Sequence, residues 1–415
     1  MTNPYHYFPT HRHRLNPRQI GPYLDHFATE LATKGYTPLT IGDYLASIAH
    51  FGEWAQSAGI AVETISDESI AAFATHQCEC LGARKHERVS RKYVARVTRF
   101  VHYLRQQGVV SAVEKPLCCT HQPSCAQFRH WLHQHRGLSP RTIEAYEYVI
   151  SRLQPLLGSD MTQCNAATVR RVVLAETGRY SRAYAKRIVT ALRAYLRFLA
   201  AKGLCHSCLV QAVPKVAQWK LSALPRYLVA DDVERVLASC DLNTLLGVRD
   251  HAILLLLARL GLRGGDIVTL SLNDIDWQEG TLRVRGKGRR EFRLPLPQDV
   301  GDALLVYLET WRPQVAIGRA FLCVNAPYRP FATSTSVSNI VRFALCRAGI
   351  VNPPSRGAHL LRHSAATSML RAGATLDAIA TVLRHRSSDT TAHYAKVDIV
   401  MLRQVAQPWP EDAPC

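Results

Sequence analysis

A segment of the chain occurs twice, 102 residues apart. Residues 35–41 read GYTPLTI and residues 137–143 read GLSPRTI, and each copy continues to a tyrosine, Tyr44 or Tyr146. In both copies a hydroxyl residue precedes a proline, which is typical of a capped helix start, and apolar residues follow at helical spacing. Solenoid repeats have shorter periods of about 20–50 residues. We therefore predict two copies of a small all-helical domain.

Each copy also contains a second, basic helix. The first is predicted from Ser90 to Gly108 and the second from Ser181 to Gly203, and both end at a glycine suited to terminate a helix. Basic helix faces are often simply solvated, but here they occur twice. The candidates for contact with a nucleic-acid backbone are Arg91, Lys92 and Arg96 in the first copy, and Arg182, Lys186 and Arg187 in the second.

The net charge points to a polyanionic partner. Lys and Arg number 51 against 32 Asp and Glu, which gives a formal net charge of +19. Such an excess attracts nucleic acid and speeds association with it. An anionic membrane surface is the weaker alternative, because no amphipathic basic helix stands apart from the predicted cores. A charge that serves only solubility is the third interpretation.

The hydropathy pattern indicates a soluble chain. No apolar run approaches the ~20 residues that a membrane-spanning helix needs. The first residues are polar and rich in histidine, unlike a signal peptide. We therefore expect a cytoplasmic protein, associated with the nucleoid if DNA is its partner, and no membrane contact.

The twelve cysteines are irregularly placed and do not suggest a disulfide scaffold. None of three local groups has the paired CxxC spacing of a structural zinc site, so we expect reduced thiols and no metal. The three groups are His76, Cys78, Cys80 and His86; Cys118, Cys119, His121 and Cys125; and Cys205 with Cys208.

The last third of the chain differs in character from the repeated part. Residues 114–124 and 213–226 are rich in proline or small residues and are predicted linkers. Beyond them, Thr281–Arg285 and Glu291–Leu296 alternate as strands around a GKGRR turn. Helices are predicted over residues 231–240, 248–260, 302–311, 334–348, 359–372 and 376–383. The fold class is therefore mainly α with a small antiparallel sheet.

Several residues of this last third suit phosphodiester chemistry. Arginine forks match phosphate oxygens and stabilise the charge that grows in a transition state. Lysine and histidine transfer protons, and a tyrosine phenol can form a covalent phosphoryl link. With no metal-binding carboxylate cluster and no Walker-type loop apparent, the pattern favours a covalent mechanism that needs no metal or nucleotide cofactor. The residues are Arg263, with Asp266 able to orient its guanidinium, then Lys287, His359, Arg362, His385 and Tyr394.

This order of residues resembles the active-site pattern of the tyrosine recombinase, or phage-integrase-like, family. The segments GLRGGDIVTLSLNDIDW, GKGRREFRLPLP, HLLRHSAATSMLRAG and LRHRSSDTTAHY each resemble a catalytic-domain motif of that family, and together they cover about residues 226–400. The upstream copies resemble its helical, SAM-like core-binding domain. The resemblance implies a site-specific recombinase acting on double-stranded DNA.

The resemblance also implies a role for each residue. Tyr394 attacks a DNA phosphate and leaves a 3′-phosphotyrosyl link, while Arg263 and Arg362 bind its non-bridging oxygens. Lys287 protonates the 5′-oxygen, His359 assists proton transfer at the tyrosine, and His385 hydrogen-bonds the phosphate. His363 and His393 are interpreted as structural or supporting. Family members exchange strands within a tetramer through a Holliday junction, for integration, excision or transposition of a mobile element.

The sequence departs from the family pattern at two positions. Arg384 stands where the family often has glycine, and Asp266 stands where glutamate is commoner. The further DNA-contact candidates are Arg289, Arg290 and Arg384. Residues 398–407 form a short, partly apolar segment in which Val400, Met401 and Leu402 are expected to pack either on a neighbouring protomer or on their own domain. The expected division is a tail (1–14), two helical domains (15–112 and 123–213), linkers (113–122 and 214–225), a catalytic domain (226–400) and a tail (401–415).

Two other functions remain open from the sequence. A catalytically silent DNA-binding or architectural protein could share this scaffold, although no catalytic residue is missing. A relaxing topoisomerase would use the same chemistry, but the duplicated binding domains favour site-specific exchange. Sister recombinases or accessory factors are further partners that the sequence leaves open.

Overall fold

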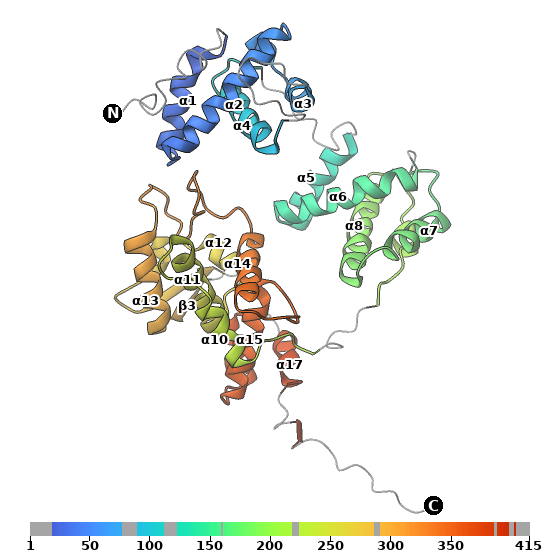
Figure 1. The fold of residues 1–415 in the computed structure, drawn as a ribbon. Coiled ribbons are helices and arrows are strands. Elements are labelled where there is room, and N and C mark those ends of the chain that lie inside the picture. The colour runs from blue at the N-terminus through green and yellow to red at the C-terminus, as the bar shows by residue number, and fades with distance from the viewer. Residues whose placement is uncertain are drawn as a thin grey trace, which may run out of the picture. The chain divides into compact units, whose positions relative to one another are not determined.

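The computed structural model describes residues 19–76, 89–111, 123–158, 161–217, 224–285, 291–385, 388–397 and 402–403. The chain divides into two compact units, one of residues 113–222 and the other of residues 1–112 with 223–415. Three modules with separate hydrophobic cores follow one another along the chain, as the colours of Figure 1 show. No helix in the described ranges is both long enough and apolar enough to cross a bilayer.

The first module is a small helical bundle around an aromatic core. Phe27, Phe51, Phe73 and Phe100 are all at most 1 % exposed and come from four different helices. The burial of such large apolar side chains is the main source of stability for a domain of this size. Its elements are α1 (Gly21–Thr33), α2 (Pro38–Ser57), the short 3-10 helix η3 (Val62–Thr64), α3 (Asp67–Thr75) and α4 (Arg91–Gln106).

The second module repeats this arrangement of helices. Its core gathers Phe128, Leu153, Leu192 and Phe198, and α8 packs against α6 and α7 as α4 packs against α2 and α3. Its elements are α5 (Pro123–Arg136), α6 (Pro140–Leu157), α7 (Ala166–Thr177), α8 (Arg182–Ala201) and the short α9 (Leu209–Ala212).

The structure confirms the predicted helix starts and ends of the repeat. Thr37 and Ser139 cap α2 and α6, each accepting a hydrogen bond from the backbone N–H three residues later. Pro38 and Pro140 occupy the first helical turn, where a missing N–H costs nothing. Gly108 and Gly203 follow α4 and α8 with φ of +74° and +72°, a conformation that glycine adopts without strain.

The third module is mainly helical with a three-stranded antiparallel sheet in the order β1-β2-β3. In the register Leu282 faces Leu294 and Val284 faces Phe292. The mainly α fold class predicted from the sequence is confirmed. The elements are α10 (Ala230–Ala238), α11 (Leu245–Arg259), α12 (Gly264–Thr269), η4 (Leu272–Asp274), β1 (Ile275–Asp276), β2 (Thr281–Arg285), β3 (Glu291–Pro295), α13 (Gln298–Val306), η5 (Tyr307–Trp311), α14 (Ser334–Arg347), α15 (Ala358–Arg371), α16 (Leu376–Leu383) and α17 (Ser388–Ala395).

Helix α11 is the centre of this third module. Its run from Ala252 to Ala258 is buried on every side, as expected of a helix that is apolar all round. It packs against α13 and α15. This contact brings the C-terminal end of α11, where Arg263 follows, close to Arg362 on α15.

In the two helical modules the sequence analysis predicted two helices in each copy and did not identify α1, α3, α5, α7 and α9. In the third module the elements that it missed are short. Helix α12 has six residues, β1 has two and α17 has eight. Segments of this length contain too few apolar positions to establish a period. Two of them position predicted site residues, because α12 begins just after Arg263 and α17 contains Tyr394.

Candidate active site

The guanidinium groups of Arg263 and Arg362 meet at the end of helix α16. Arg362 is 3 % exposed and donates to the backbone carbonyls of Gly261 and Leu383. Arg263 donates from Nη2 to the carbonyl of Arg384 at 3.0 Å and, more weakly, to that of Leu383 at 3.5 Å. The partial negative charge at a helix C-terminus attracts cations, so the end of α16 holds both arginines together.

Gly261 makes this approach sterically feasible. Its φ is +58°, and a Cβ at this position would lie 2.5 Å from a methyl carbon of Leu383. A side chain would therefore both strain the backbone and push α16 away. The glycine after α11 thus allows Leu383 and Arg362 to reach the residues that precede Arg263.

The partner of Asp266 differs from the sequence expectation. We expected its carboxylate to orient the guanidinium of Arg263. Instead Asp266 Oδ2 accepts the backbone N–H of Arg263 at 2.8 Å and Nη2 of Arg384 at 2.6 Å. The Arg384 side chain, a predicted DNA contact, has no exposed surface because this ion pair holds it inside. A direct contact between Arg384 and DNA would require the side chain to move.

His385 is oriented by a buried threonine. Its Nδ1 lies 2.8 Å from Oγ1 of Thr391, which is 1 % exposed, and its backbone N–H donates to Ala380. One ring nitrogen is thereby fixed, and Nε2 remains available to a ligand. His359 is exposed, one turn before Arg362 on α15.

Tyr394 is buried and hydrogen-bonded to a histidine that the sequence analysis left as structural. Its ring is 1 % exposed, and its hydroxyl lies 2.7 Å from Nδ1 of His363. The ring of His385 is stacked parallel to the ring of Tyr394, with 6.4 Å between the ring centroids. The signal for His363 was its place next to Arg362 in the motif, but only the packing of α17 against α15 reveals the contact.

Burial changes the protonation of this cluster. Desolvation, assisted by neighbouring imidazoles and arginines, lowers the pKa of both His363 and His385 to about 4. Burial raises the pKa of Tyr394 to about 12, and it lowers that of Arg362 to about 10. At neutral pH the two imidazoles are therefore uncharged, and the phenol keeps its proton.

Acid should therefore destabilise the third module. Between pH values of about 6.5 and 4 the unfolded chain binds protons at His363 and His385 that the folded chain does not, so the free energy of unfolding falls as the pH falls through this window. Urea unfolding at pH values of about 7 and 5 measures the loss. Replacing both histidines with glutamine should diminish the difference, and an unchanged difference would contradict the assignment.

A cavity of about 530 Å³ lies beside the arginines. Its lining is basic and includes two of the three expected phosphate ligands, Arg263 and His385, but not the buried Arg362. Tyr394 is not among the lining residues, because its ring packs with Ala366, Ile379 and Leu383. The arginines and histidines among the lining residues are Arg263, Arg285, His359, Arg384 and His385.

The predicted DNA contacts of the helical modules are mostly exposed. Arg91 and Lys92 lie on the surface of α4, and Arg182, Lys186 and Arg187 lie on that of α8. Arg96 is the exception, because it donates to the Asp43 carboxylate at 2.6 Å and to the Ser47 hydroxyl at 3.2 Å. Arg96 therefore ties α4 to α2, and its contact with DNA remains a prediction.

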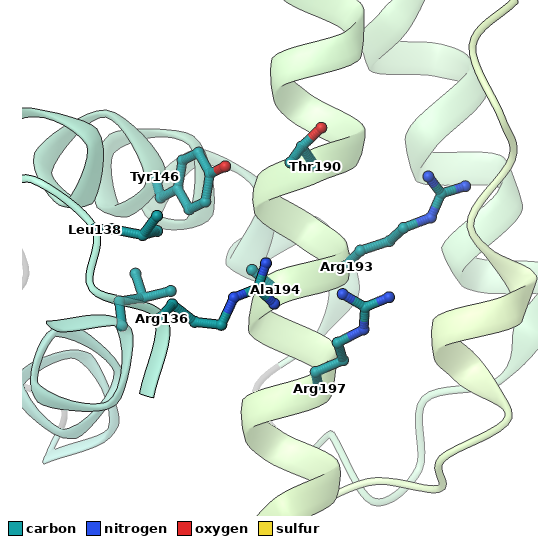
Figure 2. Close-up of a pocket in the computed structure, with 8 residues that line it drawn as sticks. Arg136, Leu138, Tyr146, Thr190, Arg193, Ala194 and Arg197 are labelled. Carbon is teal, nitrogen blue, oxygen red and sulfur yellow. The ribbon is translucent and has the colours of Figure 1, made fainter. Parts of the chain in front are cut away.

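The second module contains a basic hollow that the sequence analysis did not identify. A pocket of about 220 Å³ is bordered by Arg136, Arg193 and Arg197, with Leu138 and Tyr146 beside them. Figure 2 shows the Arg136 side chain extending toward α8, which carries the other two arginines. Arg193 is held by the carbonyls of Val213 and Pro214.

Several predicted residues lie outside the described part of the chain. They are Lys287, Arg289, Arg290, Val400 and Met401, together with Cys78, Cys80, His86, Cys118, Cys119 and His121. Leu402 is described and is 41 % exposed. Within the described ranges no cluster of three or more His, Cys, Asp or Glu side chains is arranged to hold a metal ion.

Comparisons with known proteins give one family. The model of the phage integrase family matches residues 226–399, and that of the phage integrase N-terminal SAM-like domain matches residues 125–203. A Sinorhizobium fredii protein named as an integrase/recombinase is 38 % identical over 407 residues, 95 % of each chain. Tyrosine recombinase XerD of Listeria innocua is 32 % identical over 289 residues, covering 67 % of this chain and 95 % of that protein.

A solved structure shares the fold. The XerH site-specific recombinase bound to its palindromic difH substrate, in a post-cleavage complex, matches with a TM-score of 0.56 and 17 % identity, covering 88 % of this chain and 97 % of XerH. The family resemblance predicted from the motifs is thus confirmed. The chain belongs to the phage integrase family and is a tyrosine-type site-specific recombinase.

Proposed function

We propose that the chain cleaves and rejoins DNA strands at a specific site through a phosphotyrosine at residue 394, and exchanges strands in a tetramer through a Holliday junction. In this proposal the helical modules at 15–112 and 123–213 bind DNA together with the catalytic module at 226–400. Integration, excision or transposition of a mobile element is the outcome. The observation that carries the proposal is the convergence of Arg263, Arg362, His385 and Tyr394 at the end of α16.

The chemistry balances without an external energy source. The hydroxyl oxygen of Tyr394 bonds to the phosphorus while the bond from phosphorus to the 5′-oxygen breaks. Lys287 supplies the proton of the new 5′-hydroxyl, and Arg263 and Arg362 stabilise the charge on the non-bridging oxygens. Because one phosphodiester is exchanged for another ester, a 5′-hydroxyl from a partner strand can reverse the step.

His363 is the best-placed acceptor for the phenolic proton. Its Nδ1 lies 2.7 Å from the Tyr394 hydroxyl, and its depressed pKa keeps it unprotonated at neutral pH. The family resemblance implied this role for His359. The centroid of its ring lies 6.3 Å from that of His363. His359 is thus a neighbour of His363, which itself contacts the phenol. Attack requires Tyr394 to leave its buried position for the cavity.

Replacing His363 with phenylalanine should slow covalent adduct formation by about 10²–10⁴-fold in a single turnover, because the phenol loses its proton acceptor. DNA binding should be unaffected. His393→Phe is the matched control, since the His393 ring also lies near Tyr394, at 6.2 Å, and should cleave within about threefold of the wild-type rate. Equal rates for the two variants would remove His363 from the mechanism.

A plasmid assay tests the function as a whole. The substrate is a supercoiled plasmid with two copies of the DNA site that the protein selects from host DNA. Recombined circles support the proposal. Relaxed circles alone would indicate a topoisomerase, and binding without any strand cleavage would indicate an architectural protein.

A further inference from the structure

Arg384 has an unusual backbone conformation for its residue type. It follows the last residue of α16 with φ of 56° and ψ of 50°. This left-handed region strains a side chain with a Cβ and favours glycine. Among the described residues that are not glycine, only Arg384 and Asn352 have positive φ. Strain of this kind persists only where the surrounding contacts impose it.

Arg384, Arg263 and Asp266 form a closed hydrogen-bond network. The Arg384 side chain is 0 % exposed and donates from Nη2 to Asp266 Oδ2 at 2.6 Å. The same carboxylate oxygen accepts the backbone N–H of Arg263 at 2.8 Å. The carbonyl of Arg384 accepts Nη2 of Arg263 at 3.0 Å. Arg263 is therefore held at its backbone by Asp266 and at its guanidinium by Arg384.

Stability alone does not explain why an arginine stands in this hydrogen-bond network. Nε and Nη1 of Arg384 are buried, and neither has a hydrogen-bond partner among the described residues. A buried charge with unmade hydrogen bonds opposes folding, and a glycine would give the turn without strain. Arg384 also lines the cavity that Arg263 and His385 border. A functional reason for the arginine therefore lies in this cavity.

The charge on Arg384 decides what Asp266 can bind. Among the described residues that line the cavity, Asp266 is the one with an acidic side chain, and Arg263 is three residues away. While Arg384 occupies this carboxylate, the guanidinium of Arg263 bonds to backbone carbonyls and stays beside the cavity. Without Arg384, the strongest available acceptor for the Arg263 guanidinium would be Asp266, since an ion pair is stronger than a bond to a neutral carbonyl.

We propose that Arg384 is a positioning residue that neutralises Asp266 and thereby keeps the Arg263 guanidinium turned toward the DNA phosphate. This inference rests on the proposed function. It assigns Arg384 an indirect role, acting through Arg263. A direct bond between Arg384 and a phosphate is the competing interpretation, and the two differ in what a second substitution at Asp266 does.

The test measures covalent adduct formation on a nicked DNA substrate that traps the phosphotyrosine, at saturating DNA. Arg384→Gly should slow the reaction by about 10–100-fold, as expected when one catalytic group is misplaced. Adding Asp266→Asn should restore most of the rate, since the neutral amide no longer captures Arg263. Arg384→Lys should stay within about threefold of wild type, because an ammonium group still pairs with Asp266.

Controls separate positioning from folding and binding. Asn352→Gly relieves the same backbone strain at an exposed position and should leave the rate unchanged. The Kd for intact DNA and the Tm should be similar for Arg384→Gly and wild type. A wild-type rate for Arg384→Gly, or no rescue by Asp266→Asn together with weaker DNA binding, would overturn the inference. Absence of any adduct from the wild-type protein would instead count against the proposed function.

Discussion

Replacing Tyr394 with phenylalanine is expected to abolish the covalent protein–DNA adduct while DNA binding stays within about twofold of wild type. The substitution removes one oxygen atom, the nucleophile. Tyr394 is 1 % exposed and packs with Ala366, Ile379 and Leu383, so phenylalanine fills the same space. The lost hydrogen bond to His363 should lower the free energy of unfolding by only about 1 kcal/mol.

The measurement is denaturing electrophoresis of the protein after incubation with a nicked DNA substrate that prevents religation. Tyr307→Phe is a matched control, because Tyr307 is also a buried tyrosine with a hydrogen bond to its hydroxyl, donated by the backbone of Leu322. That variant should still form the adduct. A covalent complex from Tyr394→Phe would show that another residue is the nucleophile.

Replacing Arg362 with glutamine is expected to slow adduct formation by at least about 10²–10³-fold, the usual effect of removing a group that stabilises transition-state charge. The same change should lower the free energy of unfolding by about 1–3 kcal/mol, because the carbonyls of Gly261 and Leu383 lose their charged donor. We therefore expect Arg362 to have a structural and a chemical role.

Two comparisons separate these roles. Arg371→Gln removes a charge from the other end of α15, where the guanidinium contacts the Tyr227 hydroxyl at 2.9 Å, and it should change neither quantity strongly. Rates are measured below the Tm of every variant, with DNA at saturation. A variant of Arg362 that is less stable but cleaves at the wild-type rate would exclude Arg362 from phosphate binding.

The repeated helices and the residues of the candidate site were predictable from local sequence. The caps at Thr37 and Ser139 follow from the residues beside them, and the apolar positions at helical spacing in α2 and α6 form their buried faces. The order of Arg263, Arg362, His385 and Tyr394 identified the site because each residue lies in its own recognisable motif.

The contacts between these motifs were not predictable, because they join residues far apart in the chain. Arg384 is 118 residues from Asp266, and His363 is 31 residues from Tyr394. A local interpretation therefore assigned Asp266 to the guanidinium of Arg263 and Arg384 to a contact with DNA. The contacts between the motifs arise from the tertiary packing of α12 with the end of α16 and of α15 with α17. The spacing of residues along the sequence does not predict such packing.

The proposed reaction requires that these side chains form a single site in which Tyr394 becomes bonded to the phosphate. The most direct measurement is mass spectrometry of the peptide that remains linked to DNA after trapping and digestion. We expect one linkage, from the hydroxyl of Tyr394 to a 3′-phosphate, with a free 5′-hydroxyl on the other side of the break. A linkage at any other residue, or to a 5′-phosphate, would contradict the account.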